Sequence, residues 1–183
     1  MEMKPVRVMF EDEARFGRIN DPRRCWAQQG VRPVTHQQII REYTYAYGAF
    51  SPMDGGMDSL ILPDMYAGTM SVFLKEVSER HSRELILMVM DGAPCHRASN
   101  LVIPSNMEIL KLPPYCPQLN PSENMWDELR EKAFANRSFK SMEHLEDHLC
   151  TALQHCENSP ETVQSITKWN WIAETIHSFL IAD

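Results

Sequence analysis

Apolar and polar side chains alternate along residues 6–12, and Asp12 continues the apolar face of that segment. A period of two predicts a strand with one buried face, which here ends at the acid. Residues 39–50 are rich in Tyr and Thr and predict a second strand. The turn-forming residues 51–56 then lead to a returning strand at residues 59–62.

The hydrophobic period lengthens further along the chain. Apolar residues at helical spacing predict an amphipathic helix over residues 69–81, whereas the wholly apolar run 85–90 predicts a central strand buried on both faces. Residues 107–112 form another short strand closed by two prolines, and residues 17–33 predict turns with a short hairpin. Further helices are predicted from Asn120 to about Asn136, over residues 142–153 and over residues 169–180. A mixed sheet followed by helices predicts an α/β domain.

Length and composition fit a single domain. The chain has 183 residues, 43% of them hydrophobic and 23% charged, which is enough for one compact core. Its longest apolar run is too short to span a membrane, and its first residues lack the apolar centre of a signal peptide, so we expect a cytoplasmic protein. Five scattered cysteines without a CxxC pair favour reduced structural thiols over a disulfide scaffold or a zinc ribbon.

Charge is distributed unevenly along the chain. The net charge of −7 is awkward for a protein that binds nucleic acid, since such proteins usually carry a basic footprint. Residues 1–41 nevertheless hold eight basic and five acidic side chains, whereas Lys168 is the only Lys or Arg from Ser141 onward. Phosphate contacts are therefore expected from the N-terminal third. The candidates are Arg15, Arg18, Arg23 and Arg24, with a solvated loop as the alternative.

Three acids fall at the expected ends of elements, where α/β folds place their chemistry. Asp12 follows the first strand, Asp91 follows the buried strand, and Glu123 opens a helix. Three carboxylates brought together repel one another unless cations neutralise them, and hard oxygen ligands select Mg²⁺ or Mn²⁺ over zinc. Two such ions roughly 3.5–4 Å apart support phosphoryl transfer. On composition alone, a turn or a helix cap explains each acid equally well.

Three sequence blocks resemble the signature motifs of one enzyme family. They are FEDE at residues 10–13, MDGAPCH at 90–96 and LPPYCPQLNPSENMW at 112–126. The third block is long and specific, and RRCWAQQG at residues 23–30 resembles the segment that follows the first acid. Over about residues 6–137 the chain resembles the mariner-type superfamily of DDE transposases, in its bacterial insertion-sequence branch.

The resemblance implies one catalytic domain with an RNase H-like fold, as in retroviral integrases, with C-terminal helices at residues 141–183. It implies catalytic and metal-binding roles for Asp12, Asp91 and Glu123. Asp12 would bridge two Mg²⁺ or Mn²⁺ ions, and the other two acids would each hold one. The implied reaction is DNA strand cleavage and strand transfer on transposon ends and target DNA, with TA as the implied target, by a homodimer on DNA.

Two departures from the family pattern affect this expectation. Between Asp91 and Glu123 lie 31 residues, fewer than is usual in the family, and a shortened loop before Met107 would account for the difference. The chain also offers no segment for the N-terminal helix-turn-helix domains with which family members read transposon ends. We therefore expect those domains to be absent and sequence-specific end binding to need another polypeptide.

Residues beside the triad carry further expectations. Glu13 adjoins Asp12 but faces the other way in a strand, so it either orients a metal ligand or lies on the surface. His96 either supports the metal site, contacts a phosphate or is a plain loop histidine. Asn120 is expected to cap the helix that carries Glu123, with positioning of that carboxylate as an added role.

Two other functions stay open at this point. An inactive transposase remnant would keep the fold as a DNA-binding or dimerisation scaffold; the acidic net charge favours it and the intact triad opposes it. An RNase H-type nuclease acting on RNA–DNA hybrids is the third hypothesis, and the long Pro-rich block at residues 112–126 opposes it.

Overall fold

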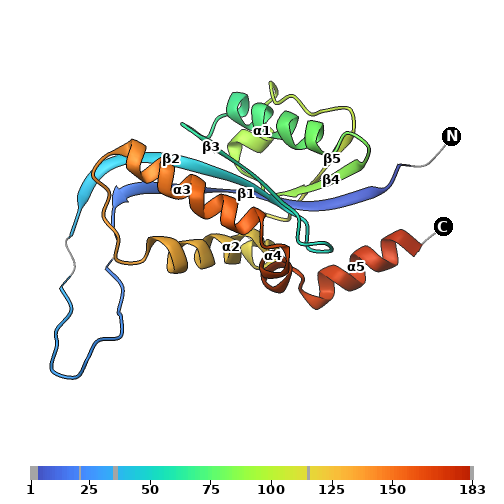
Figure 1. The fold of residues 1–183 in the computed structure, drawn as a ribbon. Coiled ribbons are helices and arrows are strands. Elements are labelled where there is room, and N and C mark those ends of the chain that lie inside the picture. Colours follow the sequence, from blue (N-terminus) through green and yellow to red (C-terminus); the bar gives the residue numbers. More distant parts are fainter. Residues whose placement is uncertain (1–3, 21, 35–36, 115, 182–183) are drawn as a thin grey trace.

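The protein folds into a mixed sheet with helices on both faces, in a computed structural model that describes residues 4–20, 22–34, 37–114 and 116–181 (Figure 1). The strands are β1 (Val6–Ile19), β2 (Ile39–Phe50), β3 (Met57–Leu62), β4 (Leu85–Met90) and β5 (Met107–Lys111). The helices are α1 (Ala67–Arg80), α2 (Ser122–Leu129), α3 (Met142–Glu157), α4 (Pro160–Thr167) and α5 (Asn170–Ile181), with short turns η1 (Pro94–Arg97), η2 (Pro117–Leu119) and η3 (Arg130–Phe134). The prediction of an α/β domain is confirmed.

β1 lies at the centre of the sheet, whose order is β3-β2-β1-β4-β5. β2 runs antiparallel to β1 and β3, while β4 runs parallel to β1 and β5. Helix α1 covers one face of the sheet, and α2 to α5 cover the other (Figure 1). Both faces of β1 are therefore enclosed by other elements, and its alternate side chains meet different helices.

β1 is longer than the alternation of residues 6–12 predicts. Its parallel pairing with β4 stops at Phe10, but its antiparallel pairing with β2 continues to Ile19. The alternation continues as well, because Phe16 is buried on the same face as Phe10, the face that α2 to α5 cover. The prediction that the first strand ends at Asp12 is therefore wrong. Asp12 lies within β1, just past the point where β4 separates from it.

The segment predicted to form a short hairpin instead forms an extended arm. Residues 22–34 contain no strand or helix, and they project from the body of the protein between β1 and β2 (Figure 1). All of these residues are exposed, including Trp26 at 103% and Val34 at 88%. The apolar side chains of the arm are exposed, so the arm buries no surface that would hold two short strands against the body.

The remaining elements follow the predicted order, with boundaries within about four residues. The helix predicted to run to about Asn136 continues from α2 through the π-helical turn η3, and it ends before Asn136, whose φ is 57°. The sequence patterns do not predict α4. That helix has eight residues and buries only Val163 and Thr167, so its periodic signal is short.

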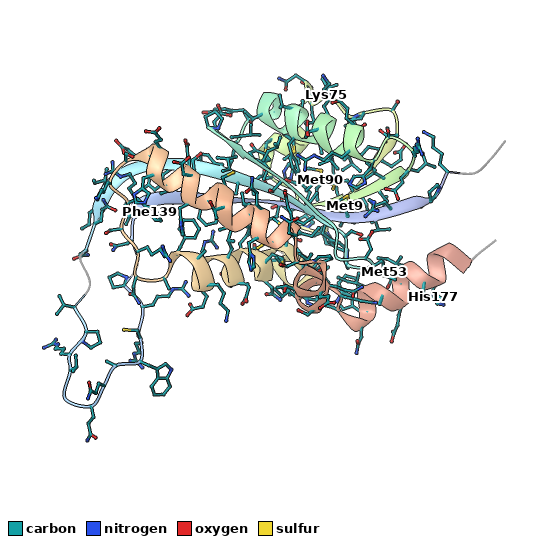
Figure 2. The ribbon with its side chains drawn as sticks, viewed as in Figure 1. Met9, Met53, Lys75, Met90, Phe139 and His177 are labelled. Carbon is teal, nitrogen blue, oxygen red and sulfur yellow. The ribbon has the colours of Figure 1, made fainter. Side chains whose placement is uncertain are left out.

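Methionine and aromatic side chains fill the core. Met9, Met70, Met88 and Met90 pack between the sheet and α1 without exposure, and Figure 2 shows Met9 and Met90 beneath that helix. Each such burial contributes roughly 1.5–3 kcal/mol. Trp126 is buried on the opposite face. No helix among the described residues is long and apolar enough to cross a membrane.

Candidate active site

The alternation of β1 sends neighbouring acids to opposite faces of the sheet. Asp12 lies on the face covered by α2, where the negative charge of Glu123 acts on it. Glu11 and Glu13 lie on the face covered by α1, where both approach His96 of η1. The expectation that Glu13 faces away from Asp12 therefore holds.

Asp12 is half-buried among other negative groups. Burial, followed by the negative charges of Glu123, Glu13 and Asp91, raises its pKa to about 8, although the backbone N–H of Glu13 donates to the carboxylate and opposes the shift. A carboxyl group with this pKa is easily protonated at neutral pH, whereas a cation would hold it ionised. The surroundings of Asp12 thus favour a positive ligand.

Two buried polar side chains dock the start of α2 on β1 and so position Glu123. Ser122 Oγ donates to the Phe10 carbonyl at 3.3 Å, and Asn120 Nδ2 donates to the Glu11 carbonyl at 3.5 Å. These two carbonyls lie just before Asp12 in the chain. Asn120 Oδ1 also accepts the Ser122 N–H at 3.2 Å, which satisfies one of the free donors at the helix start.

Asn120 is not the N-cap predicted from the sequence, but its side chain accepts the Ser122 N–H and ties the start of α2 to β1. The helix itself begins one residue later than predicted, at Ser122, because Pro121 takes the capping position. Glu123 falls in the first turn of α2 and is exposed. The positive end of the helix dipole stabilises a carboxylate at this place.

Asp91 directly follows β4, at the edge of the sheet beside Asp12. Its Oδ1 accepts the Ala93 N–H at 2.8 Å and lies 2.8 Å from His96 Nδ1. These two contacts fix the orientation of a carboxylate that is itself 51% exposed. Asp91, Glu123 and Asn120 line one cleft of about 390 Å³, whose other wall includes Leu112, Pro113, Pro114, Cys116 and Pro117.

Asp91 and Glu123 offer carboxylate oxygens to this cleft, and the charges of both act on the carboxylate of Asp12. Hard donors of this kind suit Mg²⁺ or Mn²⁺. Within the part of the chain that the structure describes, Glu13, Cys95 and His96 are the one group of potential ligands whose atoms all lie within 4.8 Å of each other. The three triad carboxylates do not form a group of this kind.

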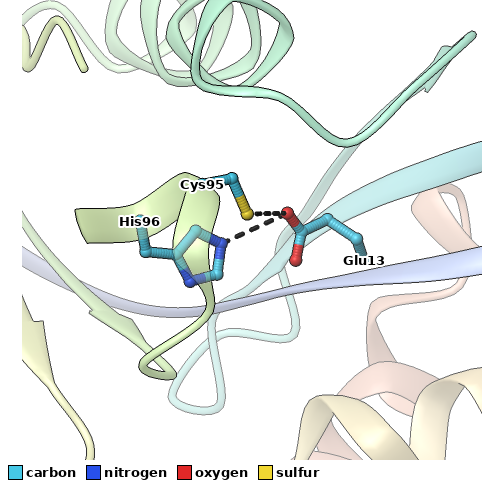
Figure 3. A group of neighbouring side chains, drawn as sticks. All are labelled: Glu13, Cys95 and His96. Atoms are coloured by element: carbon cyan, nitrogen blue, oxygen red, sulfur yellow. Dashed lines mark hydrogen bonds and ion pairs between the residues drawn. The ribbon is translucent and has the colours of Figure 1, made fainter. Parts of the chain in front are cut away.

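The opposite face of β1 holds a cluster that combines expected and unexpected residues. Glu13 Oε1 accepts from Cys95 Sγ at 3.4 Å and lies 3.2 Å from His96 Nε2, as Figure 3 shows. Neither Glu11 nor Cys95 was expected at a site from the sequence. Their signals were the two-residue spacing of Glu11 and Glu13, which puts both on one face, and the adjacency of Cys95 to His96.

Charge and burial are extreme in this cluster. Glu11 is fully buried, and burial raises its pKa well above the ordinary range. Burial alone would lower the pKa of His96, but its contacts with Asp91, Cys95 and Glu13 raise it. His96 is thus buried against the carboxylates of Glu11, Glu13 and Asp91 and is not a plain loop histidine.

The four arginines predicted to contact phosphate lie in different environments. Arg18 donates to the carbonyls of Phe139 and Lys140 and pairs with Glu42, so it ties β1 to the chain before α3. Arg15 lies over the Tyr43 ring, and Arg23 pairs with Glu131. Arg24 is exposed on the arm. A cavity of about 220 Å³ at the base of the arm is lined by Arg15, Arg23, Arg130 and Arg137.

Known proteins resemble this chain in sequence. The DDE superfamily endonuclease profile matches residues 7–146. The "Uncharacterized protein y4pE/y4sA" of Sinorhizobium fredii (strain NBRC 101917 / NGR234) is 30% identical over 130 residues, which make up 70% of this chain and 96% of that protein.

Solved structures of a mariner transposase share the fold at low sequence identity. The Mos1 mariner paired-end complex with Mn has a TM-score of 0.59 and 19% identity, covering 89% of this chain and 56% of the transposase. The Mos1 strand transfer complex has a TM-score of 0.58 and 18% identity, covering 89% and 55%. The chain thus spans about half the length of these transposases. The likeness confirms the predicted RNase H-like architecture.

Proposed function

The chain belongs to the DDE superfamily of endonucleases, and on that premise we propose that Asp12, Asp91 and Glu123 bind two Mg²⁺ or Mn²⁺ ions and catalyse DNA strand cleavage and strand transfer. The observation that carries the proposal is the crowding of these acids around Asp12, whose pKa rises because of burial and the neighbouring carboxylates. Such crowding is stable when cations occupy the site.

Each acid has a role set by its position. Asp12 is half-buried and feels the charge of both other acids, so its carboxylate would hold the metal ions together with theirs. Glu123 is held by the docked start of α2, and Asp91 by its contacts with Ala93 and His96. When bound, the ions would activate an attacking oxygen and stabilise the leaving oxygen of an in-line phosphoryl transfer. The Pro-rich wall of the cleft would confine the strand being cut.

The DNA backbone would run past the arginine-lined cavity at the base of the arm. Arg15, Arg23, Arg130 and Arg137 give that cavity a positive lining on a chain whose net charge is −7. Arginine forks match phosphate geometry, so this local charge offsets the unfavourable average. Arg24 on the arm would extend the contact, whereas Arg18 is occupied by its own structural bonds and takes no part.

The likeness to Mos1 complexes supports the DNA substrate and a paired assembly of two copies. Those structures are a paired-end complex with Mn and a strand transfer complex of the Mos1 transposase. A homodimer on DNA, transposon ends as substrates, the TA target and a separate polypeptide for end binding all stay predictions for this chain.

A plasmid-nicking assay tests the proposal without knowledge of the terminal sequence. We expect the protein to nick supercoiled DNA with Mg²⁺ or Mn²⁺, and Asp91→Ala to abolish the activity. Asp127→Asn is the matched control, because it removes an exposed acid from α2, the helix that carries Glu123. Full nicking by Asp91→Ala in metal-containing buffer would contradict the assignment.

Calorimetric titration with Mn²⁺ separates an active enzyme from an inactive remnant. The proposal expects binding of two ions that Asp12→Asn weakens strongly. A folded wild-type protein that binds no Mn²⁺ and nicks no DNA would instead be a scaffold. Cleavage restricted to RNA–DNA hybrids would favour the RNase H-type alternative.

A further inference from the structure

A second group of potential metal ligands lies on the face of β1 opposite the triad. Glu11 and Glu13 come from β1, and Cys95 and His96 come from η1 (Figure 3 shows the last three). The four side chains contribute two carboxylates, a thiol and an imidazole. Three of them, from Glu13, Cys95 and His96, place their ligating atoms within 4.8 Å of one another.

Glu11 provides an independent sign that this cluster awaits a ligand. Its side chain is 0% exposed, and both carboxylate oxygens are buried without a hydrogen-bond partner among the described residues. Buried polar atoms are almost always satisfied in folded proteins, and a buried carboxylate needs a cation or a donor. His96 Nε2 lies 3.4 Å from Glu11 Oε2, and it also faces Glu13. One imidazole thus faces two buried carboxylates.

Three of the distances among the four groups match the edges of a small coordination tetrahedron. Zinc bonds of about 2.0–2.3 Å place tetrahedral ligands roughly 3.3–3.8 Å apart. The corresponding distances here are 3.2 Å from His96 Nε2 to Glu13 Oε1, 3.4 Å from Cys95 Sγ to Glu13 Oε1, and 3.4 Å from His96 Nε2 to Glu11 Oε2. Small movements of side chains would close these atoms around one ion.

We propose that Glu11, Glu13, Cys95 and His96 form a buried site for a single zinc-like divalent cation, separate from the triad. A thiolate and an imidazole favour a borderline-soft ion such as Zn²⁺ over Mg²⁺. Cys95 must lose its thiol proton to bind, and that proton passes to solvent. The site is closed, since all four side chains are nearly or fully buried, as in structural zinc sites with no open position.

The second nitrogen of His96 connects this site to the triad. Its Nδ1 lies 2.8 Å from Asp91 Oδ1. Metal-binding histidines commonly donate their other N–H to a carboxylate, which fixes the tautomer and the ring orientation. The buried cation would therefore hold the histidine that orients Asp91. The existence of this site does not depend on the proposed catalytic function.

Cobalt titration tests the site directly. With Co²⁺ added to the full chain, we expect a thiolate-to-cobalt charge-transfer band in the near ultraviolet, saturating at one equivalent. Cys95→Ser should abolish the band, and Cys150→Ser, at an exposed position on α3, should leave it intact. Glu123→Gln should also leave it intact, because that residue lies on the other side of β1.

Competition with Zn²⁺ adds a measurement that retains the thiol. Glu13→Gln should weaken Zn²⁺ binding by at least about a hundredfold, more than loss of an outer partner does. Far-UV circular dichroism checks that each variant is folded. If Cys95→Ser does not fold, Zn²⁺ binding by Glu13→Gln tests the proposed site.

Three results would overturn the proposal: no band in the folded wild-type protein, a band that survives Cys95→Ser, or Zn²⁺ binding unchanged in Glu13→Gln. Loss of the band in folded Glu123→Gln would move the ion to the catalytic face and overturn it too. Conversely, a wild-type protein that shows the cobalt band but never nicks DNA would contradict only the catalytic function.

Discussion

The two faces of β1 carry acids of the same kind in different surroundings. On one face, Asp12 meets the charges of Glu123 and Asp91, and those two acids line an open cleft. On the other face, Glu11 and Glu13 are enclosed with a thiol and an imidazole. Glu11, Asp12 and Glu13 are consecutive residues of the same strand. The difference between their surroundings therefore comes from the elements that pack against each face.

This comparison shows how a strand can separate two chemistries by a single residue. Shifting register by one position would exchange the faces, because side chains alternate with a period of exactly two residues. Helix α2 brings a carboxylate and leaves a cleft, whereas η1 brings nitrogen and sulfur and closes the space. The open face suits hard ions that must also reach DNA phosphates, and the closed face suits a resident ion.

The largest expected effect comes from a pair of isosteric changes, one on each face. Glu123→Gln should lower Mn²⁺-dependent nicking by at least about a thousandfold, comparable to loss of a group that stabilises transition-state charge. Glu13→Gln should retain far more nicking but lose Zn²⁺ affinity. Initial nicking rates and cobalt spectra on the same preparations check both. Equal effects of the two changes on both readouts would show that the faces are not separate sites.

His96→Gln sharpens the comparison by removing the link between the faces. Asp91 loses its contact with Nδ1, so Mn²⁺ binding at the triad should weaken by about tenfold to a hundredfold, as for other outer partners of metal ligands. The Mn²⁺ concentration for half-maximal nicking measures this change. His144→Gln, at an exposed position on α3, serves as the control. An unchanged Mn²⁺ requirement would mean that His96 does not orient Asp91.

The sequence predicts the sheet and most helices because their periods are local properties. The runs 39–50 and 85–90 become β2 and β4 with the predicted limits. The end of β1 is missed because Asp12 interrupts an apolar face that resumes at Ala14 and Phe16, and the local pattern treats a charged residue as a boundary. The placement of that acid inside a strand depends on where β4 separates, which is a tertiary fact.

The triad and the buried cluster also differ in how far the sequence predicts them. Asp12, Asp91 and Glu123 were expected from long motifs and from their places near element ends. Glu13 and Cys95 are in contact although they lie 82 positions apart in the chain. A local hydrophobic period cannot predict such a contact. The absence of a CxxC pair also favoured a plain structural thiol. Such spacing says nothing of Glu11 and Glu13, the two side chains of the cluster that lie on β1.

A smaller effect is expected from the two side chains that dock α2 on β1. Ser122→Ala and Asn120→Ala each remove a buried hydrogen bond and should lower the free energy of unfolding by about 1 kcal/mol. Nicking should fall by about tenfold, because Glu123 is then held less rigidly. Urea unfolding and nicking rates measure the two effects, with exposed Asn124→Ala as the control on the same helix. Reduced stability with unchanged nicking would limit these residues to folding.

The smallest expected effect is a pH dependence of the free energy of unfolding, which arises from Asp12 on the open face. In the metal-free protein, Asp12 has a pKa of about 8, against 3.8 for an ordinary Asp. Between these values the folded state holds a proton that the unfolded state has lost, so stability falls as pH rises, by at most about 1.4 kcal/mol per pH unit. From pH 6 to 7 we expect a loss of about 1 kcal/mol that Asp12→Asn lacks.

Comparing the two proteins isolates Asp12, because Glu11 contributes a slope of the same sign to both. Saturating Mn²⁺ should abolish the difference between wild type and Asp12→Asn in pH slope, since a bound cation keeps the carboxylate ionised. Denaturant unfolding at several pH values provides the measurement. Parallel pH profiles without metal would show that Asp12 is not held in the negative surroundings that the catalytic proposal requires. The open face would then lose its main physical argument, while the zinc site on the closed face would stand on its own ligands.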